Sequence, residues 1–319
     1  MSSDSDLTDV VRTFREHPGL RAKSALRLVT DVLGPTDWLH GPGDDAALVP
    51  TDGQAVFVAG EAIWPPLLEA DPFGAGVAAV VANVNDVAAM GARPLALVDT
   101  LIGPEHVARL CLEGMRFATE LYGVPVVGGH LTVRDGPPAL SAFVVGQAAT
   151  PLSARNVRPG QTLLLACCLS GEMRPDFPFF SSLRERGELL RGDVDLLAQA
   201  AEVGMCLAAK DVSMAGLLGS LAMLLEGTGS GVTVLLDRLP CPAGVPLRRW
   251  IAAFPSFAFL LCCPQDGAEP CRRLFQDRGL SCETIGVLDG SGELRVEQHG
   301  QEALLTDLNR EAVTGLEFG

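Results

Sequence analysis

Positive charge is scarce in this chain. Its 319 residues include 24 lysines and arginines against 39 aspartates and glutamates, for a formal net charge of −15. Proteins that bind nucleic acid normally carry a basic footprint that neutralises phosphates, and none is evident here. We therefore do not expect nucleic acid as a partner. Anionic nucleotides can still bind, provided that divalent cations and helix N-termini neutralise the local field.

Long apolar runs and paired cysteine motifs are also missing. No apolar run reaches 18 residues, and the chain starts with polar and acidic residues rather than a charged and then apolar leader. The nine cysteines form no CxxC pair and show no cysteine–histidine spacing typical of zinc. We therefore expect no membrane partner and no secretion, and we predict a cytoplasmic protein whose cysteines are buried free thiols.

Carboxylates stand out where the sequence is otherwise apolar. Asp44 and Asp45 lead into an apolar strand, and Asp86 lies midway along an apolar, glycine-containing helix. A buried carboxylate is costly unless it is paired or binds a cation, and Mg²⁺ prefers hard oxygen ligands of this kind. These residues fit a metal site, but they equally fit an acidic turn and a helix surface.

The length and the order of elements predict two domains of the α+β class. A chain of 319 residues exceeds the usual size of one domain. Residues 153–160 are polar, rich in turn formers and without apolar periodicity, so we place the boundary there, with domains at 1–150 and 151–319. Apolar periodicity predicts helices at 20–33, 72–91, 104–122, 193–209, 214–226, 268–278 and 303–312, and strands at 46–50, 55–63, 93–102, 124–127, 139–148, 161–169, 232–236, 257–263, 281–288 and 293–299.

Four segments together resemble a known superfamily. They are GDDAALV from Gly43, VNDVAAMGARPLAL from Val84, VVGGHLT from Val126 and KDVSMAGLLGSL from Lys210. In order and spacing they are similar to aminoimidazole ribonucleotide (AIR) synthetase, selenophosphate synthetase, thiamine-monophosphate kinase and the hydrogenase-maturation carbamoyl dehydratase. The resemblance implies an N-terminal dimerising α/β domain that binds metal and ATP, a C-terminal α+β sandwich domain, and a homodimer.

The resemblance also implies roles for individual residues. It makes Asp44, Asp45 and Asp86 ligands of Mg²⁺, and it adds Asp211 as a ligand from the second domain, although Asp just ahead of a helix is also a common N-cap. Phosphoryl transfer depends mainly on positioning and charge neutralisation, so such a set needs no nucleophilic side chain. The residues that we expect to contact the nucleotide are Lys23, Gly43, Asn85, Gly128, Gly129 and Lys210.

Lysine usage supports part of this set independently. The chain uses arginine for 22 of its 24 basic residues, and its only lysines are Lys23 and Lys210. A compact ammonium suits phosphate contacts, which is a reason to keep lysine at particular positions, although two lysines can also persist by chance. Lys23 lies where related synthetases place a phosphate-contacting lysine, and Lys210 directly precedes Asp211.

Two further positions have functional and structural interpretations. Gly128 and Gly129 end a strand where backbone amides can approach an anion, and His130 follows them where the related kinases carry Asp. His130 is our candidate for proton transfer or phosphate contact, although a lone histidine is more often structural. Arg174 lies in a loop rich in phenylalanine and proline, which either binds an anionic substrate or forms a hydrophobic plug.

Departures from the superfamily narrow the chemistry. The first cysteine is Cys111, inside a predicted helix, which disfavours selenium activation, and the sequence ends without the cysteine of the carbamoyl dehydratase. Met214 replaces an Asp of thiamine-monophosphate kinase. We expect a Mg²⁺-dependent enzyme that transfers the ATP phosphoryl group to a small metabolite or activates it, kinase-like or cyclo-ligase-like. The alternative is a non-catalytic nucleotide-binding scaffold or sensor dimer, which His130 and Met214 would fit.

Overall fold

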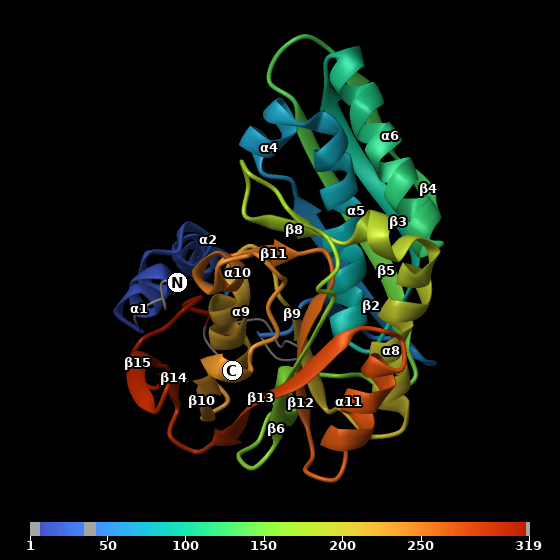
Figure 1. The fold of residues 1–319 in the computed structure, drawn as a ribbon. Coiled ribbons are helices and arrows are strands. Elements are labelled where there is room, and N and C mark those ends of the chain that lie inside the picture. Colours follow the sequence, from blue (N-terminus) through green and yellow to red (C-terminus); the bar gives the residue numbers. More distant parts are fainter. Residues whose placement is uncertain (1–6, 35–42, 317–319) are drawn as a thin grey trace. The chain divides into compact units, whose positions relative to one another are not determined.

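The computed structural model of the chain describes residues 7–34 and 43–316 and divides into two compact units (Figure 1). Unit 2 comprises Asp45–Pro151 and Leu183–Gln199, and unit 1 comprises the described residues up to Asp44, Leu152–Ser182 and those from Ala200 onward. The chain passes from unit 1 to unit 2 between the neighbouring residues Asp44 and Asp45. One division lies after Pro151, but the units are not the contiguous segments 1–150 and 151–319, because the described residues up to Asp44 group with unit 1 and Leu183–Gln199 group with unit 2.

Unit 2 is a five-stranded sheet covered on one face by helices. The strand order is β1-β2-β5-β3-β4, and all neighbours pair antiparallel except β3 and β4, which are parallel. Figure 1 shows α5 and α6 lying side by side along this sheet. The elements are β1 (Ala47–Val49), β2 (Ala55–Ala62), α4 (Pro65–Ala70), α5 (Pro72–Ala89), β3 (Arg93–Gly103), α6 (Glu105–Tyr122), β4 (Val126–Val133), β5 (Ala139–Ala148), α7 (Leu183–Arg186), η3 (Gly187–Leu189) and most of α8 (Leu190–Glu202).

Glycines let α5 and α6 approach each other closely. A Cβ at Gly76 would lie 2.0 Å from the carbonyl oxygen of Cys111, and one at Gly114 would lie 2.0 Å from that of Phe73. The Asp71 carboxylate accepts a hydrogen bond from the Gly74 amide at the start of α5. By length and composition alone α5 could cross a membrane, but 72% of it is buried inside the protein, as in a core helix.

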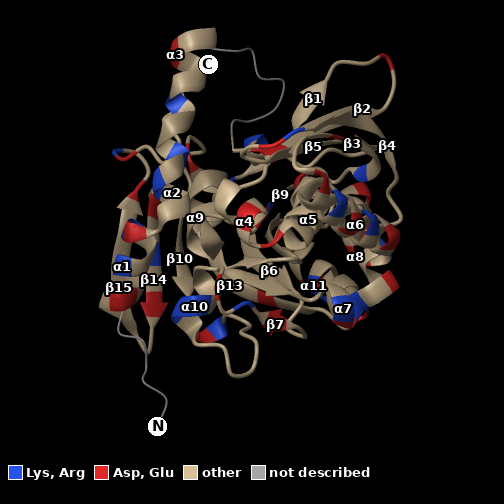
Figure 2. Ribbon diagram, turned by 90° about the horizontal axis from the view of Figure 1, so that it is seen from above, with Lys and Arg blue, Asp and Glu red and all other residues tan. Residues whose placement is uncertain are grey.

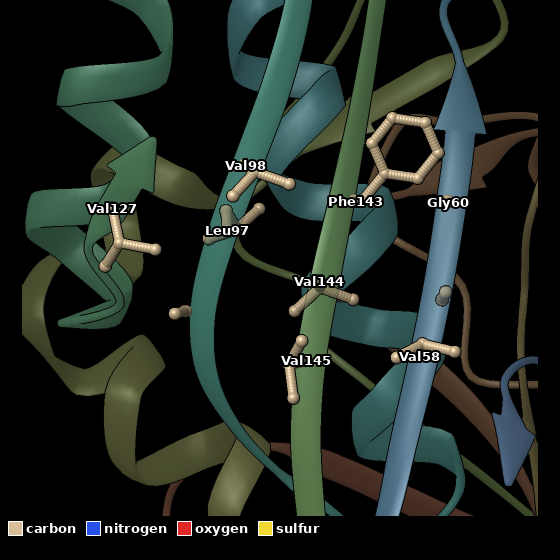
Figure 3. A pocket seen from close by; sticks show the side chains of 10 residues that line it. Val58, Gly60, Leu97, Val98, Val127, Phe143, Val144 and Val145 are labelled. Atoms are coloured by element: carbon tan, nitrogen blue, oxygen red, sulfur yellow. The ribbon is translucent and has the colours of Figure 1, made fainter. Parts of the chain in front are cut away.

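The other face of the same sheet is open and apolar. Val58 on β2, Phe143 and Val145 on β5, Val98 on β3 and Val127 on β4 line a hollow of about 520 Å³ (Figure 3). All five side chains are more than a third exposed, Val127 by 64%. Strand β4 lies at the edge of the sheet, so its outer backbone groups have no strand neighbour within unit 2. This exposed apolar face needs an explanation from function.

Unit 1 is built around a seven-stranded mixed sheet of order β15-β14-β10-β13-β6-β12-β9, with a small three-stranded sheet β11-β8-β7. Its core gathers aliphatic side chains from the central strands and from α9, whose ten residues are all buried. The elements are α1 (Leu7–Glu16), α2 (Pro18–Lys23), η1 (Ser24–Leu26), α3 (Arg27–Leu33), η2 (Ala154–Asn156), β6 (Thr162–Cys167), β7 (Glu172–Met173), β8 (Phe179–Ser181), β9 (Ala208–Asp211), α9 (Gly216–Leu225), β10 (Gly231–Leu235), η4 (Leu236–Arg238), α10 (Leu247–Ile251), β11 (Phe254–Pro255), β12 (Ala258–Cys263), α11 (Ala268–Gln276), β13 (Ser281–Asp289), β14 (Glu293–Gln298) and β15 (Gln301–Asp307).

The prediction of a closing helix at 303–312 is wrong, because this segment begins as a strand. Strand β15 pairs antiparallel with β14, and the two are joined by His299 and Gly300 with φ of 52° and 77°. Two residues of positive φ make the tight turn that matches the twist of a hairpin. The cross-strand pairing therefore overrides the local helical spacing of alanines and leucines.

Candidate metal and nucleotide site

Asp45 and Asp86 come together within unit 2. Asp45 lies just ahead of β1 and Asp86 lies in the last turns of α5, and each brings a carboxylate oxygen to within 4.8 Å of the other's. Asp86 is only 6% exposed. Two carboxylates this close repel each other when both are ionised, and a divalent cation relieves that repulsion. The donor set of hard oxygens therefore fits Mg²⁺.

Asn85 lies beside Asp86 and is fully buried in α5. Asn83, also fully buried, donates a hydrogen bond from its amide nitrogen to the Ala79 carbonyl one turn earlier. The last turns of α5 thus concentrate three polar side chains in a helix that is otherwise apolar. A nucleotide contact by Asn85 stays a prediction.

Asp99 is a buried carboxylate that the sequence reasoning missed. It lies on β3 between the inward-facing Leu97 and Leu101 and is 8% exposed. Burial raises the pKa of the Asp99 carboxyl, and a hydrogen bond from its own backbone works in the opposite direction. The sequence did contain a signal for this residue, because Asp99 occupies a position of β3 that faces inward and would normally be apolar.

Gly128 and Gly129 lie inside β4 rather than at the end of a strand as predicted, and Gly128 is in register with Val98. Gly129 is in register with Asp99, and a Cβ at Gly129 would lie 2.2 Å from Oδ1 of Asp99. The glycine therefore makes room for this carboxylate, a local reason for its presence that does not involve a nucleotide. Next to it, His130 is exposed, and its Nε2 lies 3.1 Å from Oγ1 of Thr132. Whether Gly128, Gly129 and His130 contact a substrate stays a prediction.

Asp44 has hydrogen bonds within unit 1. Its Oδ2 accepts from the Ser153 hydroxyl at 2.7 Å, and its Oδ1 accepts from the Ala154 amide at 2.6 Å. The carboxylate thereby fixes the chain to the start of η2, more than a hundred residues later in the sequence. Asp44 has a structural role that the sequence did not reveal, and its role as a metal ligand stays a prediction.

Lys210 and Gly43 are also joined within unit 1. The Lys210 side chain is 5% exposed, and its Nζ donates to the Gly43 carbonyl at 3.1 Å. Gly43 in turn lies against α9, because a Cβ there would be 2.7 Å from the Met223 carbonyl oxygen. Together with the Asp44 bonds, this contact holds both residues that precede Asp45.

The other predicted residues of unit 1 lie on three different elements. Asp211 ends β9 and is 1% exposed, whereas Lys23 ends α2 and is half-buried. Arg174 follows β7 and pairs with Asp176, with Nη2 and Oδ2 2.9 Å apart, while its guanidinium carbon lies 5.2 Å from the centre of the Phe177 ring. The Arg174 guanidinium holds the pKa of Asp176 below its usual range. Substrate contact by Arg174 stays a prediction.

The hydrophobic plug that we considered for the phenylalanine-rich loop is present beside Arg174. Phe180 is 1% exposed, and its ring packs edge-on against Trp250 with centroids 5.3 Å apart. Phe179 packs against Phe254 in the neighbouring strand β11. One segment therefore combines an anchored apolar end with a partly exposed arginine.

Comparison with known proteins places this arrangement in a family. The model of the AIR synthase related protein N-terminal domain matches residues 43–148, and that of the C-terminal domain matches residues 176–299. The chain belongs to the AIR synthase-related family. An uncharacterized protein of Synechocystis sp. is 32% identical over 317 residues, which cover 97% of this chain and 98% of that protein.

Two solved structures share the fold at lower identity. Thermotoga maritima PurL complexed with ADP superposes with a TM-score of 0.76 at 19% identity, covering 97% of this chain and 51% of that one. AaThiL complexed with AMPPCP and TMP superposes with a TM-score of 0.66 at 19% identity, covering 87% of this chain and 94% of that one. The expected two-domain α+β fold is confirmed, and members of the superfamily use ATP.

Proposed function

We propose that this protein is a Mg²⁺-dependent enzyme that binds ATP and transfers its phosphoryl group to a small metabolite, or uses it to activate one. The observation that carries the proposal is the approach of the Asp45 and Asp86 carboxylates to within 4.8 Å in unit 2. Adenine nucleotides bound to structures of the same fold support it.

The residues of the chain have separable tasks in this proposal. Asp45 and Asp86 would hold the cation, which supplies charge neutralisation at the phosphates. The hydrogen bonds of Asp44 and Lys210 fix the backbone that leads into Asp45, so this ligand is ordered before nucleotide arrives. From the family resemblance, we also propose Asp211 as a ligand and Lys23 as a phosphate contact.

Calorimetric titration tests the nucleotide part of the proposal. We expect ATP to bind in the presence of Mg²⁺ and to lose most of its affinity when EDTA removes the cation. Binding of equal strength with and without Mg²⁺ would contradict the metal site. A nonhydrolysable ATP analogue should bind in the same way, because the proposal assigns affinity to the metal and the phosphates rather than to turnover.

The product of a turnover assay decides between the chemical alternatives. A phosphorylated acceptor identifies a kinase, and a cyclised product with release of inorganic phosphate identifies a cyclo-ligase. If Mg²⁺ and ATP bind but no candidate metabolite stimulates hydrolysis, the non-catalytic scaffold or sensor is the better description. Metabolites should be screened with Arg174→Ala in parallel, because loss of stimulation without loss of ATP binding would place the acceptor at Arg174.

We also propose that the protein is a homodimer that buries the open face of the unit 2 sheet. That face is lined by apolar side chains (Figure 3), and β4 lies at the edge of the sheet among the strands described in unit 2. Val127→Asp places a charge on the face and should convert a dimer into a monomer in analytical ultracentrifugation. Val203→Asp is the matched control, because Val203 is 65% exposed and lies in unit 1. A monomeric wild type would contradict the proposal.

A further inference from the structure

A groove of about 520 Å³ lies in unit 1 and is lined by residues from two distant stretches of the chain, 14–24 and 305–313. It is bordered by α1, by α2 with the start of η1, and by β15 with the residues that follow it. Figure 2 shows α1 alongside β14 and β15, with α2 continuing from its end. Its floor is apolar, formed by Phe14, Leu20, Leu305 and Val313.

Two arginines on the wall of this groove are oriented by the backbone. Nε of Arg15 donates to the Leu305 carbonyl at 3.3 Å, and Nε of Arg21 donates to the Arg15 carbonyl at 2.9 Å. Within residues 7–34 and 43–316, neither arginine has a carboxylate partner. The Nη1 and Nη2 atoms of each guanidinium therefore remain available to donate paired hydrogen bonds to an anion.

One acidic residue, Glu311, also lines the groove. Oε2 of Glu311 accepts a hydrogen bond from the Thr306 hydroxyl at 2.7 Å. The surrounding segment from 12 to 27 carries five basic residues and one acidic residue in a chain whose net charge is −15. Arg12 and Arg27 pair with Asp9 and Asp31, so the excess positive charge on this side of the groove comes from Arg15, Arg21 and Lys23 against Glu16.

The part of the groove that follows β15, which includes Val313, is held in place by hydrogen bonds. The buried Glu226 carboxylate accepts hydrogen bonds from the amides of Val313 and Thr314 and from the Thr314 hydroxyl, at 2.7 to 3.1 Å. A wall fixed in this way gives up little further conformational entropy when a ligand binds.

We propose that this groove binds a small organic anion, with a carboxylate or phosphate group on the Arg15 and Arg21 forks and an apolar body on the floor. Small-molecule sites typically combine an apolar lining with a few oriented polar groups, and a groove of this volume is large enough. The proposed ligand needs neither the aspartates nor a cation, but Lys23, the proposed phosphate contact, lies on the same stretch of chain between Arg21 and Ser24.

Amide NMR spectra of isotope-labelled full-length protein in EDTA provide the test. Phenyl phosphate and benzoate are the probes, inorganic phosphate lacks the apolar body, and benzyl alcohol lacks the charge. We expect saturable shifts of groove resonances with at least one of the two probes, about tenfold weaker in Arg15→Gln and Arg21→Gln. Ser24→Trp should block the groove while leaving both arginines in place, and Arg12→Gln, on the same helix but paired with Asp9, should have no effect.

The choice of probe distinguishes the anions. A response to benzoate alone identifies a carboxylate ligand, and a response to phenyl phosphate alone identifies a phosphate ester. The proposal is overturned if neither probe gives saturable shifts, if inorganic phosphate binds as tightly as phenyl phosphate, or if Arg12→Gln weakens binding as much as Arg15→Gln does. Use of EDTA keeps this result separate from the test of Mg²⁺ and ATP.

Discussion

Asp44 and Asp45 are neighbours in the sequence but belong to different units. The Asp44 carboxylate accepts hydrogen bonds from Ser153 and Ala154 in unit 1, whereas the Asp45 carboxylate lies near that of Asp86 in unit 2. The Asp44 carboxylate is held by neutral donors, whereas the Asp45 carboxylate lies close to a like charge, and a divalent cation would relieve that repulsion. The motif thus combines an anchor with a candidate ligand.

The largest expected effect comes from removing a charge at the candidate ligand pair. Asp86→Asn should weaken Mg²⁺-dependent ATP binding about a hundredfold, because a neutral amide is a poor ligand for a hard cation. Calorimetry with and without Mg²⁺ measures this, and circular dichroism checks the fold. The exposed Asp135 provides the control variant Asp135→Asn, which should bind ATP as the wild type does. Unchanged binding by Asp86→Asn would refute the metal site.

Substitution of Asp44, the anchor, should mainly affect the stability of the folded protein. Asp44→Asn keeps one acceptor but removes the charge that two donors share, so we expect a loss of about 1–3 kcal/mol in the free energy of unfolding. Asp45→Asn should lower stability in EDTA less than Asp44→Asn does, because it also removes repulsion with Asp86. Urea denaturation of both variants in EDTA makes the comparison. A loss of Mg²⁺ dependence in Asp44→Asn as complete as in Asp86→Asn would show that the anchor is also a ligand.

The two lysines extend the same comparison. Lys210 already donates to the Gly43 carbonyl, whereas Lys23 ends a short helix and is half-buried. If Lys23 contacts phosphate, Lys23→Ala should weaken nucleotide binding about tenfold while Arg27→Ala changes it little. Competition between ATP and a fluorescent analogue measures both variants under identical conditions. Equal effects of the two substitutions would remove the claim for Lys23.

Sequence reasoning performed best where a pattern is local. The long run of small apolar residues in α5, the helical spacing of α6 and the apolar segments of β3 and β5 predicted these elements, and the GDD and VND motifs pointed to Asp45 and Asp86. The hairpin of β14 and β15 was missed because its cross-strand pairing competes with a helical spacing. The partners of Asp44 could not be predicted, since they lie 109 and 110 residues away in the sequence.

Asp99 allows the most subtle test. Its folded pKa is raised by burial, so the folded protein holds this proton more tightly than the unfolded chain does. The protonated Asp99 carboxyl therefore contributes its full stability below the pKa of the unfolded chain. This contribution is lost as the pH rises through the higher pKa of the folded protein. Asp99→Asn cannot ionise, so in EDTA its Tm should exceed that of the wild type by a few degrees at neutral pH. The difference should vanish in acid, where wild-type Asp99 is protonated in both states. Thermal melts across this pH range measure it, and a variant less stable than the wild type at every pH would show that the Asp99 carboxylate instead makes stabilising contacts in its ionised form.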